Sequence, residues 1–548
     1  MPLQKNQVLT LRVERLSSDG SGVAHSPDGE TVFIPGAAPG DEARVRIVKD
    51  CKRYAFGILD EVLTPSPDRI PVDCAVAGPC GGCSLRHLDY AAELRAKQEN
   101  VADAFARIGG LDVPVLPIVG SPEVNRYRNK VQFPVGVDKS GKPCIGFYAG
   151  RTHRIVPCPD CRLQPGVLNE IGNALCAFFA EKGIQPYSEE TGRGLVRHIF
   201  LRRGAHSGQI MVCLVCTRAR LPSAEELCTR LKVQFAEITT ILLNVNAKNT
   251  NVILGTETHT LYGQGYIEDT LCGVPVQLGP LSFYQVNTLA AEQLYGIAAQ
   301  YAQLTPDDLL LDLYCGMGTI GLSMAAHCRE LIGVEIVPEA IESAKANAAR
   351  MGADVAAKSR FFCADAGQAA TRLAAEGLHP DIVMLDPPRK GCDEATLSAV
   401  VRMSPRRVVY VSCNPATAAR DAAWLEQNGY RAEKVQPVDL FPRTRHCEAV
   451  LLLTKLHVDR HIEVEVSMDE LDVTAAESKA TYDQIRYYVW EHYQLKVSNL
   501  YIAQVKQKHG IIERENYHKA KNENAKQPKC PKEKEDAIVE ALKHFQMI

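Results

Sequence analysis

The chain has 548 residues, of which 46% are hydrophobic and 23% are charged, and its formal net charge is -3. This length predicts three or four domains, and the balanced charge means that any surface that binds nucleic acid must be local. No uncharged apolar run approaches the roughly 18 residues that span a bilayer, and Met1–Val13 lacks the apolar core of a signal peptide. We therefore expect a cytoplasmic protein whose 19 cysteines serve metal binding or catalysis rather than a disulfide framework.

Residues 1 to about 65 alternate between apolar and polar side chains in short runs separated by Gly, Asp and Pro turns. Several short strands at such spacing predict a small closed barrel of the OB type. Barrels of this type commonly bind single-stranded nucleic acid on one face, and a purely structural barrel is the alternative. The predicted strands are Val8–Val13, Thr31–Pro35, Asp41–Val48 and Tyr54–Leu59.

A group of cysteines follows the barrel. Cys80 and Cys83 are separated by two residues in a Gly-rich loop, Cys74 precedes them, and Cys158 and Cys161 form a second close pair. Such spacing is typical of metal ligands. A zinc ion would use the two close pairs, whereas a [4Fe-4S] cluster would take the first three thiolates and one later thiolate. Local spacing does not decide between these sites, and unligated thiols are the third interpretation.

The stretch from about residue 120 to 270 has the pattern of a mixed α+β region. Two predicted strands carry cations, one within Arg126–Val135 and the other within Arg197–Arg203. Arginine and tyrosine interleaved with strand residues can contact phosphates and stack on unpaired bases. A solvated charged face explains the same pattern, so both interpretations stay open.

From about residue 305 the pattern is α/β. Leu309–Leu313 is an apolar strand followed by a Gly-rich turn and a helix, and Gly316 and Gly318 allow a cofactor to approach the backbone closely. The next strand, Leu331–Glu335, ends on a carboxylate placed to accept hydrogen bonds from ribose hydroxyls. A turn of this kind also suits NAD enzymes.

Two further acids favour a different cofactor. A third strand ends near Asp365, and Ile382–Leu385 ends in Asp386 followed by two prolines. Successive acids at strand ends suit recognition of the ribose and adenine of S-adenosylmethionine (SAM), which has no second nucleotide. Ahead of these strands, Leu281–Asn287 is a polar and aromatic segment suited to covering the cofactor.

A nucleophile is predicted at Cys413. Val408–Val411 is a buried strand that breaks at Ser-Cys-Asn-Pro, which places Cys413 in the crevice where open α/β sheets bind ligands. A buried structural thiol is the alternative. Downstream, His446 and Glu448 lie just before a last predicted strand, Ala449–Leu453.

The motifs together resemble those of the RNA (uracil-5-)-methyltransferase family, and most closely its iron-sulfur, TRAM-domain-containing 23S rRNA branch. Each motif is common singly, but their ordered conjunction, from about residue 8 to about residue 455, is highly specific. In the barrel, Asp19–Ala24 and Val32–Gly36 resemble a TRAM domain, an RNA-binding module. The other motifs are Phe283–Asn287, Leu313–Gly318, Leu385–Gly391, Ser412–Pro415 and His446–Glu448.

The resemblance implies SAM as the methyl donor, Cys413 as the nucleophile and Glu448 as the proton acceptor. Uracil C5 is a poor nucleophile until a thiolate adds at C6, and a partly desolvated carboxylate suits removal of the C5 proton. His446 either orients Glu448 or is structural. The resemblance implies Gln285, Tyr314, Glu335 and Asp386 as cofactor-binding residues. The pattern of strands and turns adds Gly316 and Asp365 to this set. The implied ligands of a [4Fe-4S] cluster are Cys74, Cys80, Cys83 and Cys161, with Cys158 a bystander.

The predicted substrate is a uridine of 23S rRNA, in a loop or extruded from a helix, because stacking hides C5 and C6 from a thiol. A tRNA uridine is the alternative. Two alternative functions from other classes of protein are a non-catalytic RNA-binding or assembly protein and an NAD-linked oxidoreductase. We expect no DNA or membrane partner and a monomer.

The predicted fold class is therefore multidomain α/β. An OB-like barrel (1–65) precedes a central α+β domain with the iron-sulfur loop (66–270), a Rossmann-like SAM methyltransferase domain (271–456) and a helical, partly basic extension (457–548). In the extension, Thr481–Val489 and Asp536–Phe545 are predicted helices. The basic tract Lys506–Lys534 neutralises RNA phosphates or is a solvated tail.

Overall fold

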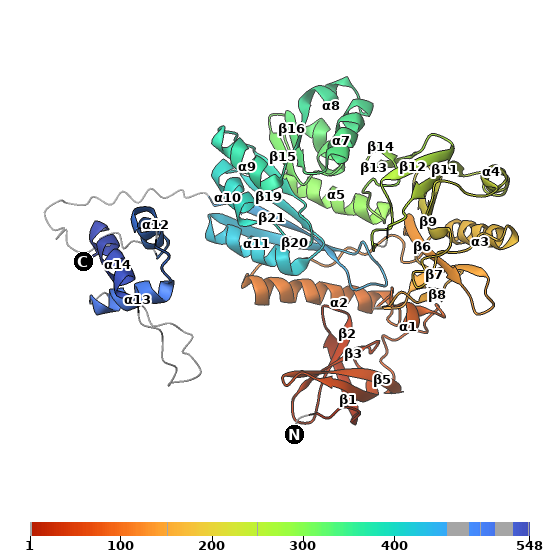
Figure 1. Cartoon of the computed structure of the whole chain (residues 1–548), viewed down its shortest axis with the longest axis horizontal. Coiled ribbons are helices and arrows are strands. Elements are labelled where there is room, and N and C mark those ends of the chain that lie inside the picture. Colours follow the sequence, from red (N-terminus) through yellow and green to blue (C-terminus); the bar gives the residue numbers. More distant parts are fainter. Residues whose placement is uncertain are drawn as a thin grey trace. The chain divides into compact units, whose positions relative to one another are not determined.

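The computed structural model describes residues 3–150, 152–248, 250–456, 482–493, 495–509, 530–545 and 547–548 (Figure 1). The chain divides into two compact units, Met1–His457 and Val458–Ile548. Within the described ranges, no helix is both long and apolar enough to cross a membrane.

The first unit begins with the predicted small closed barrel, which has five strands where four were predicted, the additional one being β2. Leu11 and Val13 point into the barrel while Arg12 is exposed, which is the alternation expected of a half-buried strand. At Gly57 a Cβ atom would lie 2.3 Å from Cγ1 of Val45, so only glycine allows these strands to pack. The strands are β1 (Val8–Leu16), β2 (Ser21–His25), β3 (Thr31–Pro35), β4 (Glu42–Asp50) and β5 (Tyr54–Thr64).

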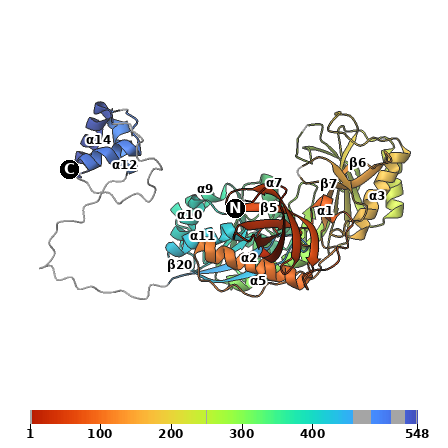
Figure 2. The same ribbon diagram turned by 90° about the horizontal axis from the view of Figure 1, so that it is seen from below.

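A long helix, α2 (Tyr90–Asp103), follows the barrel and the short α1 (Ala77–Cys80). Asp89 caps α2, because its side chain accepts a hydrogen bond from the amide of Ala92. The helix continues into a π-helical turn, Ala104–Gly109. Figures 1 and 2 show α2 lying between the barrel and the last strands of the first unit.

The central region is a seven-stranded sheet in the order β12-β11-β10-β9-β6-β7-β8. Its buried face is covered by α3 (Gly166–Glu181) and α4 (Ala224–Gln234), whose apolar residues share one core with the strands. The strands are β6 (Lys130–Val137), β7 (Pro143–Tyr148), β8 (Ile155–Pro157), β9 (Val196–Arg203), β10 (Ile210–Cys216), β11 (Ile238–Val245) and β12 (Glu257–Tyr262).

A second seven-stranded sheet follows, in the order β17-β16-β15-β18-β19-β21-β20. β17, β16, β15, β18 and β19 are parallel, and β21 runs antiparallel to both of its neighbours. The strands are β15 (Leu309–Leu313), β16 (Glu330–Glu335), β17 (Ser359–Cys363), β18 (Ile382–Leu385), β19 (Arg407–Ser412), β20 (Tyr430–Val438) and β21 (Glu448–Lys455).

Both faces of this second sheet are buried, which explains its continuously apolar strands. On β15, Leu310 belongs to one core, and Leu309, Leu311 and Leu313 belong to another. The predicted Rossmann-like α/β domain is thus confirmed. The covering elements are the hairpin β13 (Ile267–Leu271) and β14 (Val274–Leu278), and the helices α5 (Thr288–Ala302), α6 (Thr319–Met324), α7 (Pro338–Arg350), α8 (Ala353–Lys358), α9 (Ala366–Ala375), α10 (Glu394–Met403) and α11 (Pro415–Gln427), with a 3-10 turn at Ala325–His327.

The second unit has a small apolar core of its own, which includes Ile485, Val489 and Ile538. Its helices are α12 (Tyr482–Tyr493), α13 (Asn499–Lys508) and α14 (Lys532–His544). Two of these match the predicted helices, and α13 was not predicted. Most of the predicted basic tract, Lys506–Lys534, lies outside the described residues. The same holds for Thr481, the first residue of the predicted helix Thr481–Val489.

Candidate active site

The acids predicted at strand ends meet at one edge of the second sheet. Leu313 pairs with Val334 on one side and with Leu385 on the other. Tyr314, Glu335 and Asp386 each come next along the chain. They therefore emerge side by side at the carboxyl edge of the parallel strands, where open sheets bind ligands.

Cys413 and Glu448 reach the same edge from strands of opposite direction. Ser412, the last residue of β19, pairs with Ala449 of the antiparallel β21. Cys413 follows Ser412 and Glu448 precedes Ala449, so the two residues lie across from each other. The predicted pairing of a thiol with a carboxylate is thus present in the geometry.

Burial perturbs the titration of all three groups at this edge. Loss of hydration raises the pKa of Glu448 to about 8, with a further contribution from Asp386, and Arg389 opposes the shift. Burial also raises the pKa of Asp386 to about 7. The pKa of Cys413 is raised by burial and by the same two carboxylates, and again Arg389 opposes the change. Such mutually perturbed groups are typical of catalytic sites.

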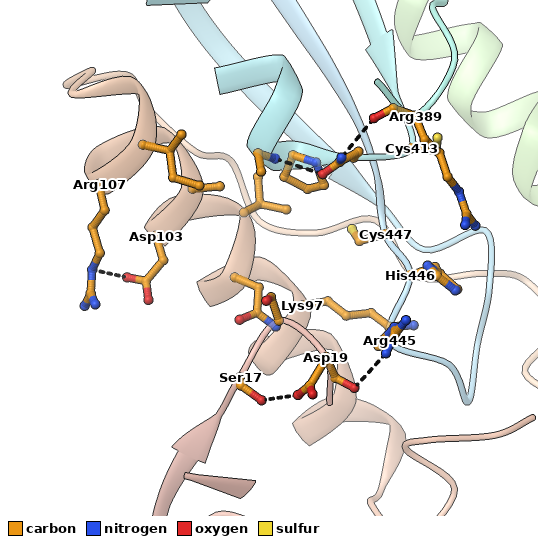
Figure 3. A pocket seen from close by; sticks show the side chains of 18 of the residues that line it. Ser17, Asp19, Lys97, Asp103, Arg107, Arg389, Cys413, Arg445, His446 and Cys447 are labelled. Atoms are coloured by element: carbon orange, nitrogen blue, oxygen red, sulfur yellow. Dashed lines mark hydrogen bonds and ion pairs between the residues drawn. The ribbon is translucent and has the colours of Figure 1, made fainter. Parts of the chain in front are cut away.

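Cys413 opens into a cleft of about 600 Å³ (Figure 3). One wall comes from the barrel, where Ser17 and Asp19 lie, and another comes from α2 and the π-helical turn. Arg445 bridges the walls, since its Nη1 donates to the carbonyl oxygen of Asp19 at 3.4 Å. Arg389 and His446 also line the cleft, and the pKa of His446 is lowered by burial and by nearby arginines.

The predicted Gly-rich turn follows β15 and leads into α6. Gly316 and Gly318 have φ angles of 55° and 80°, in the left-handed region that favours glycine. The amide of Gly316 donates to Oε2 of Glu335 at 3.1 Å, which fixes this carboxylate beside the turn. Ile336 and Val337, just beyond it, are 61% and 46% exposed and offer an apolar surface at the crevice.

The other predicted cofactor residues have additional structural contacts. The carboxylate of Asp365 caps α9 by accepting from the amide of Gln368 at 3.1 Å. Tyr314 has a φ angle of 67°, and its hydroxyl lies 3.4 Å from Oγ1 of Thr396. The carbonyl oxygen of Gln285 accepts a hydrogen bond from Nδ2 of Asn129 at 2.8 Å, which ties the cofactor segment to the central sheet.

Neither interpretation of the cations on β9 holds for Arg197 and Arg202. Both side chains are buried, with exposures of 5% and 1%. Arg197 donates to the carbonyl oxygen of Asn246 at 3.1 Å, and Arg202 donates to those of Gly279 and Ser282 at 2.7 Å each. The two arginines therefore order backbone segments instead of meeting RNA or solvent. Arg202 holds the segment that leads to Gln285, a role that the strand pattern did not indicate.

The predicted cluster cysteines face one cavity in the central region. Its volume is about 310 Å³, and it is lined by Cys74, Cys80, Cys83, Cys158 and Cys161. Cys158 thus belongs to the same wall as the predicted ligands. Its side chain hydrogen-bonds to Cys161, which raises the pKa of Cys158 and lowers that of Cys161 to about 7. In the part of the chain that is described, no group of three or more His, Cys, Asp or Glu side chains is arranged to hold a metal ion.

Two arginines organise this cavity. Arg86 is 3% exposed, pairs with Asp73 at 2.7 Å and lies against the thiol of Cys83, where its charge opposes the rise in the pKa of that thiol caused by burial. Arg126 donates to the carbonyl oxygen of Cys161 at 2.8 Å and so fixes the second cysteine loop. A buried guanidinium beside thiols suits an anionic group bound there.

Comparison with known proteins places these features in a family. The tRNA (Uracil-5-)-methyltransferase model matches residues 277–456, and the TRAM domain model matches residues 2–59. The chain is 43% identical over 453 residues to an uncharacterized RNA methyltransferase of Halalkalibacterium halodurans, and the match covers 82% of this chain and 98% of the relative. The chain belongs to the RNA (uracil-5-)-methyltransferase family.

Other relatives of this methyltransferase agree with that assignment. A Bacillus cereus RNA methyltransferase is 41% identical, with 83% of this chain and 98% of the relative covered. The solved tRNA (uracil-54, C5)-methyltransferase of Pyrococcus abyssi, in complex with S-adenosyl-L-homocysteine, is 27% identical with a TM-score of 0.65, covering 81% of this chain and all of that chain. The predicted family and the predicted SAM-dependent RNA methylation are therefore confirmed.

The raised pKa of Glu448 generates a prediction for the pH dependence of the methyltransferase. A general base works only when ionised, so kcat should rise with pH up to about 8 and level off above it if Glu448 is the predicted base and proton removal limits turnover. Below that value the rise should be about tenfold per pH unit for one group. The measurement is kcat for release of methylated RNA between pH 6 and 9, with SAM binding followed over the same range as the control. A profile that falls across this range would contradict the assignment of Glu448 as the base.

Proposed function

We propose that the methyltransferase transfers a methyl group from SAM to C5 of a uridine in RNA through a covalent bond between Cys413 and C6. The observation that carries the proposal is the placement of Cys413 opposite Glu448, at the carboxyl edge of the sheet. The thiol opens into a cleft shared with the TRAM barrel, so RNA held by the barrel reaches the nucleophile.

Cys413 begins the reaction by adding to C6 of the uracil ring as a thiolate. The electron pair of the C5–C6 double bond moves into the ring carbonyl, and the resulting enolate makes C5 nucleophilic. Arg389 assists this step, because it opposes the burial that raises the pKa of the thiol. Methylation at C5 then leaves one carbon bearing both the new methyl group and the original proton.

Glu448 completes the reaction by accepting the C5 proton. The electrons of the C–H bond re-form the C5–C6 double bond, and the sulfur of Cys413 leaves with its electron pair. The buried position of Glu448 suits this role, since a carboxylate with a raised pKa is a stronger base than one in water. Asp386 lies between the base and the cofactor residues, so it serves SAM or the uracil edge.

The residues that would hold SAM are Gln285, Tyr314, Gly316, Glu335, Asp365 and Asp386. SAM supplies the methyl group from its sulfonium. Glu335 receives the ribose beside the Gly316 turn, and Ile336 and Val337 offer an apolar surface for the adenine. The bound S-adenosyl-L-homocysteine in the P. abyssi relative supports this use of the fold.

We further propose a [4Fe-4S] cluster on Cys74, Cys80, Cys83 and Cys161. The donor set suits the group, because all four thiols line one cavity. The buried guanidinium of Arg86, which lies against Cys83, suits the negative charge of a thiolate-bound cluster. The methyl transfer moves no net electrons, and the cluster's role is to order this loop or to orient RNA.

For the substrate we propose a uridine of 23S rRNA, and tRNA is the second candidate. The TRAM barrel and the cysteine loop resemble the rRNA branch. The P. abyssi relative, a tRNA methyltransferase whose match covers 81% of this chain, favours tRNA. The architecture is therefore compatible with either RNA.

Two substitutions test the covalent mechanism. Cys413→Ala should abolish methyl transfer, because no other group activates C5. Glu448→Gln should accumulate a methylated covalent complex with RNA, since addition and methylation do not require the base. Denaturing gels with labelled SAM and labelled RNA measure both. Product formation by Cys413→Ala would reject the mechanism.

The iron-sulfur proposal is tested by metal analysis of anaerobically purified protein. We expect a brown protein with about four irons per chain. Cys74→Ala should lose most of the iron and Cys158→Ala should retain it, whereas a zinc site on the two close pairs would need Cys158 and not Cys74. Stoichiometric zinc without iron would overturn the proposal.

The substrate is tested by deleting the gene and mapping 5-methyluridine in rRNA and tRNA. We expect a loss confined to 23S rRNA, restored by the wild-type gene and not by Cys413→Ala. A loss confined to tRNA would refute the rRNA assignment and leave the catalytic mechanism intact.

A further inference from the structure

A buried ionic network joins α2 to the segment that leads into Glu448. Lys97 and Glu93 on α2 are 1% and 0% exposed, and Asp439, just after β20, is 0% exposed. Fully buried charges are costly unless they are paired and hydrogen-bonded. None of these groups takes part in the chemistry proposed above.

Lys97 is the centre of the network. Its Nζ donates to Oε1 of Glu93 at 2.7 Å, to Oδ1 of Asp439 at 2.8 Å and to the carbonyl oxygen of Phe441 at 3.1 Å. One ammonium thus uses its three protons on one residue of its own helix and two of the segment after β20. No neutral side chain of similar size provides this set of bonds.

Two neighbours of Lys97 on α2 extend the contact. The hydroxyl of Tyr90 donates to Oδ2 of Asp439 at 2.9 Å. Glu93 accepts from the backbone amide of Arg443 at 2.7 Å. Asp439, Phe441 and Arg443 are therefore all held by α2 through charged or polar groups.

The held segment ends at the proposed base. Residues 439–447 run from the end of β20 to Glu448, the first residue of β21. Lys97, His446 and Cys447 all line the cleft into which Cys413 opens (Figure 3). A shift of this segment on α2 therefore moves Glu448 relative to Cys413.

We propose that Lys97 is a positioning residue for Glu448, which acts by holding residues 439–447 against α2. This inference rests on the function proposed above and assigns a further residue to it. Without the ammonium, Glu93 and Asp439 are two buried carboxylates that repel each other. The segment then departs from α2, and the carboxylate of Glu448 departs from the C5 proton that it must accept.

The proposal predicts a defect in one step only. Addition of Cys413 and methylation of C5 need the end of β19 and the cofactor residues, none of which Lys97 touches. Removal of the C5 proton needs Glu448. Lys97→Met should therefore lower turnover by about 10- to 100-fold and leave KM for SAM within about twofold. The enzyme should accumulate as a methylated covalent complex with ordinary uridine RNA.

The experiment compares the full-length wild type with Lys97→Met, Tyr90→Phe and Arg406→Met. Tyr90→Phe removes one hydroxyl from the network and should give a smaller accumulation of the same complex. Thermal unfolding shows whether Lys97→Met folds. If it does not fold, the result with Tyr90→Phe decides whether the network positions Glu448. Arg406→Met is the matched control, because Arg406 pairs with Asp308 at 2.7 Å at the opposite edge of the sheet. It should accumulate no complex.

A second RNA, with 5-fluorouridine at the target, separates the two proposals. Its C5 fluorine cannot leave as a proton, so any enzyme that completes addition and methylation is trapped. If the wild type forms no such complex, the proposed function fails. Suppose that the wild type and Lys97→Met both form the trapped complex on the fluorinated RNA. If Lys97→Met and Tyr90→Phe then accumulate no covalent complex on uridine RNA, the positioning role is overturned. Loss of the fluorinated complex in Lys97→Met alone also overturns it, because the defect then precedes proton removal.

Discussion

One reversed strand determines the geometry of the active site. Five parallel strands bring their carboxyl ends to one edge, but a parallel strand can offer only its last residues there. β21 runs the other way between β19 and β20, so its first residue, Glu448, arrives at that edge beside the last residue of β19. The thiol of Cys413 and the carboxylate of Glu448, 35 positions apart in the sequence, are thus set across one ladder without a long loop. Slippage of that register by one residue would turn Glu448 to the other face of the sheet.

The same edge concentrates three carboxyl groups whose ionisation is opposed by burial. Asp312, Asp386 and Glu448 have pKa values raised to about 8, 7 and 8, in each case mainly by burial. One oxygen of Asp312 accepts from the amide of Gly321 at 3.0 Å, and the other has no partner among the described residues. Such an edge favours a cationic ligand, and SAM carries both a sulfonium and an ammonium group. The electrostatics of this edge and the use of SAM as cofactor are therefore consistent.

The strand ends were predictable from sequence, whereas the buried ions were not. Glu335, Asp386 and Cys413 each follow a continuous apolar run, and a parallel sheet requires such runs to end at one edge. β2 was missed because four of its five residues are buried, which removes the alternation that marks a strand. Arg197 and Arg202 were misjudged because their partners are carbonyl oxygens of distant segments. Lys97 reads as an ordinary helix cation until the fold brings Asp439, 342 positions away, against it.

The link between the barrel and the active site follows from the same segment that leads to the proposed base, Glu448. The carbonyl oxygen of Arg443 accepts from the amide of Leu85, and Arg445 donates to the carbonyl oxygen of Asp19 in the barrel. Residues 439–447 therefore contact the barrel, the linker that follows it and α2 before they enter β21. A TRAM barrel that bound RNA on a separate, freely moving module would present the uridine at no fixed distance from Cys413. Because one segment touches both, the position of the barrel and the position of the base are set together.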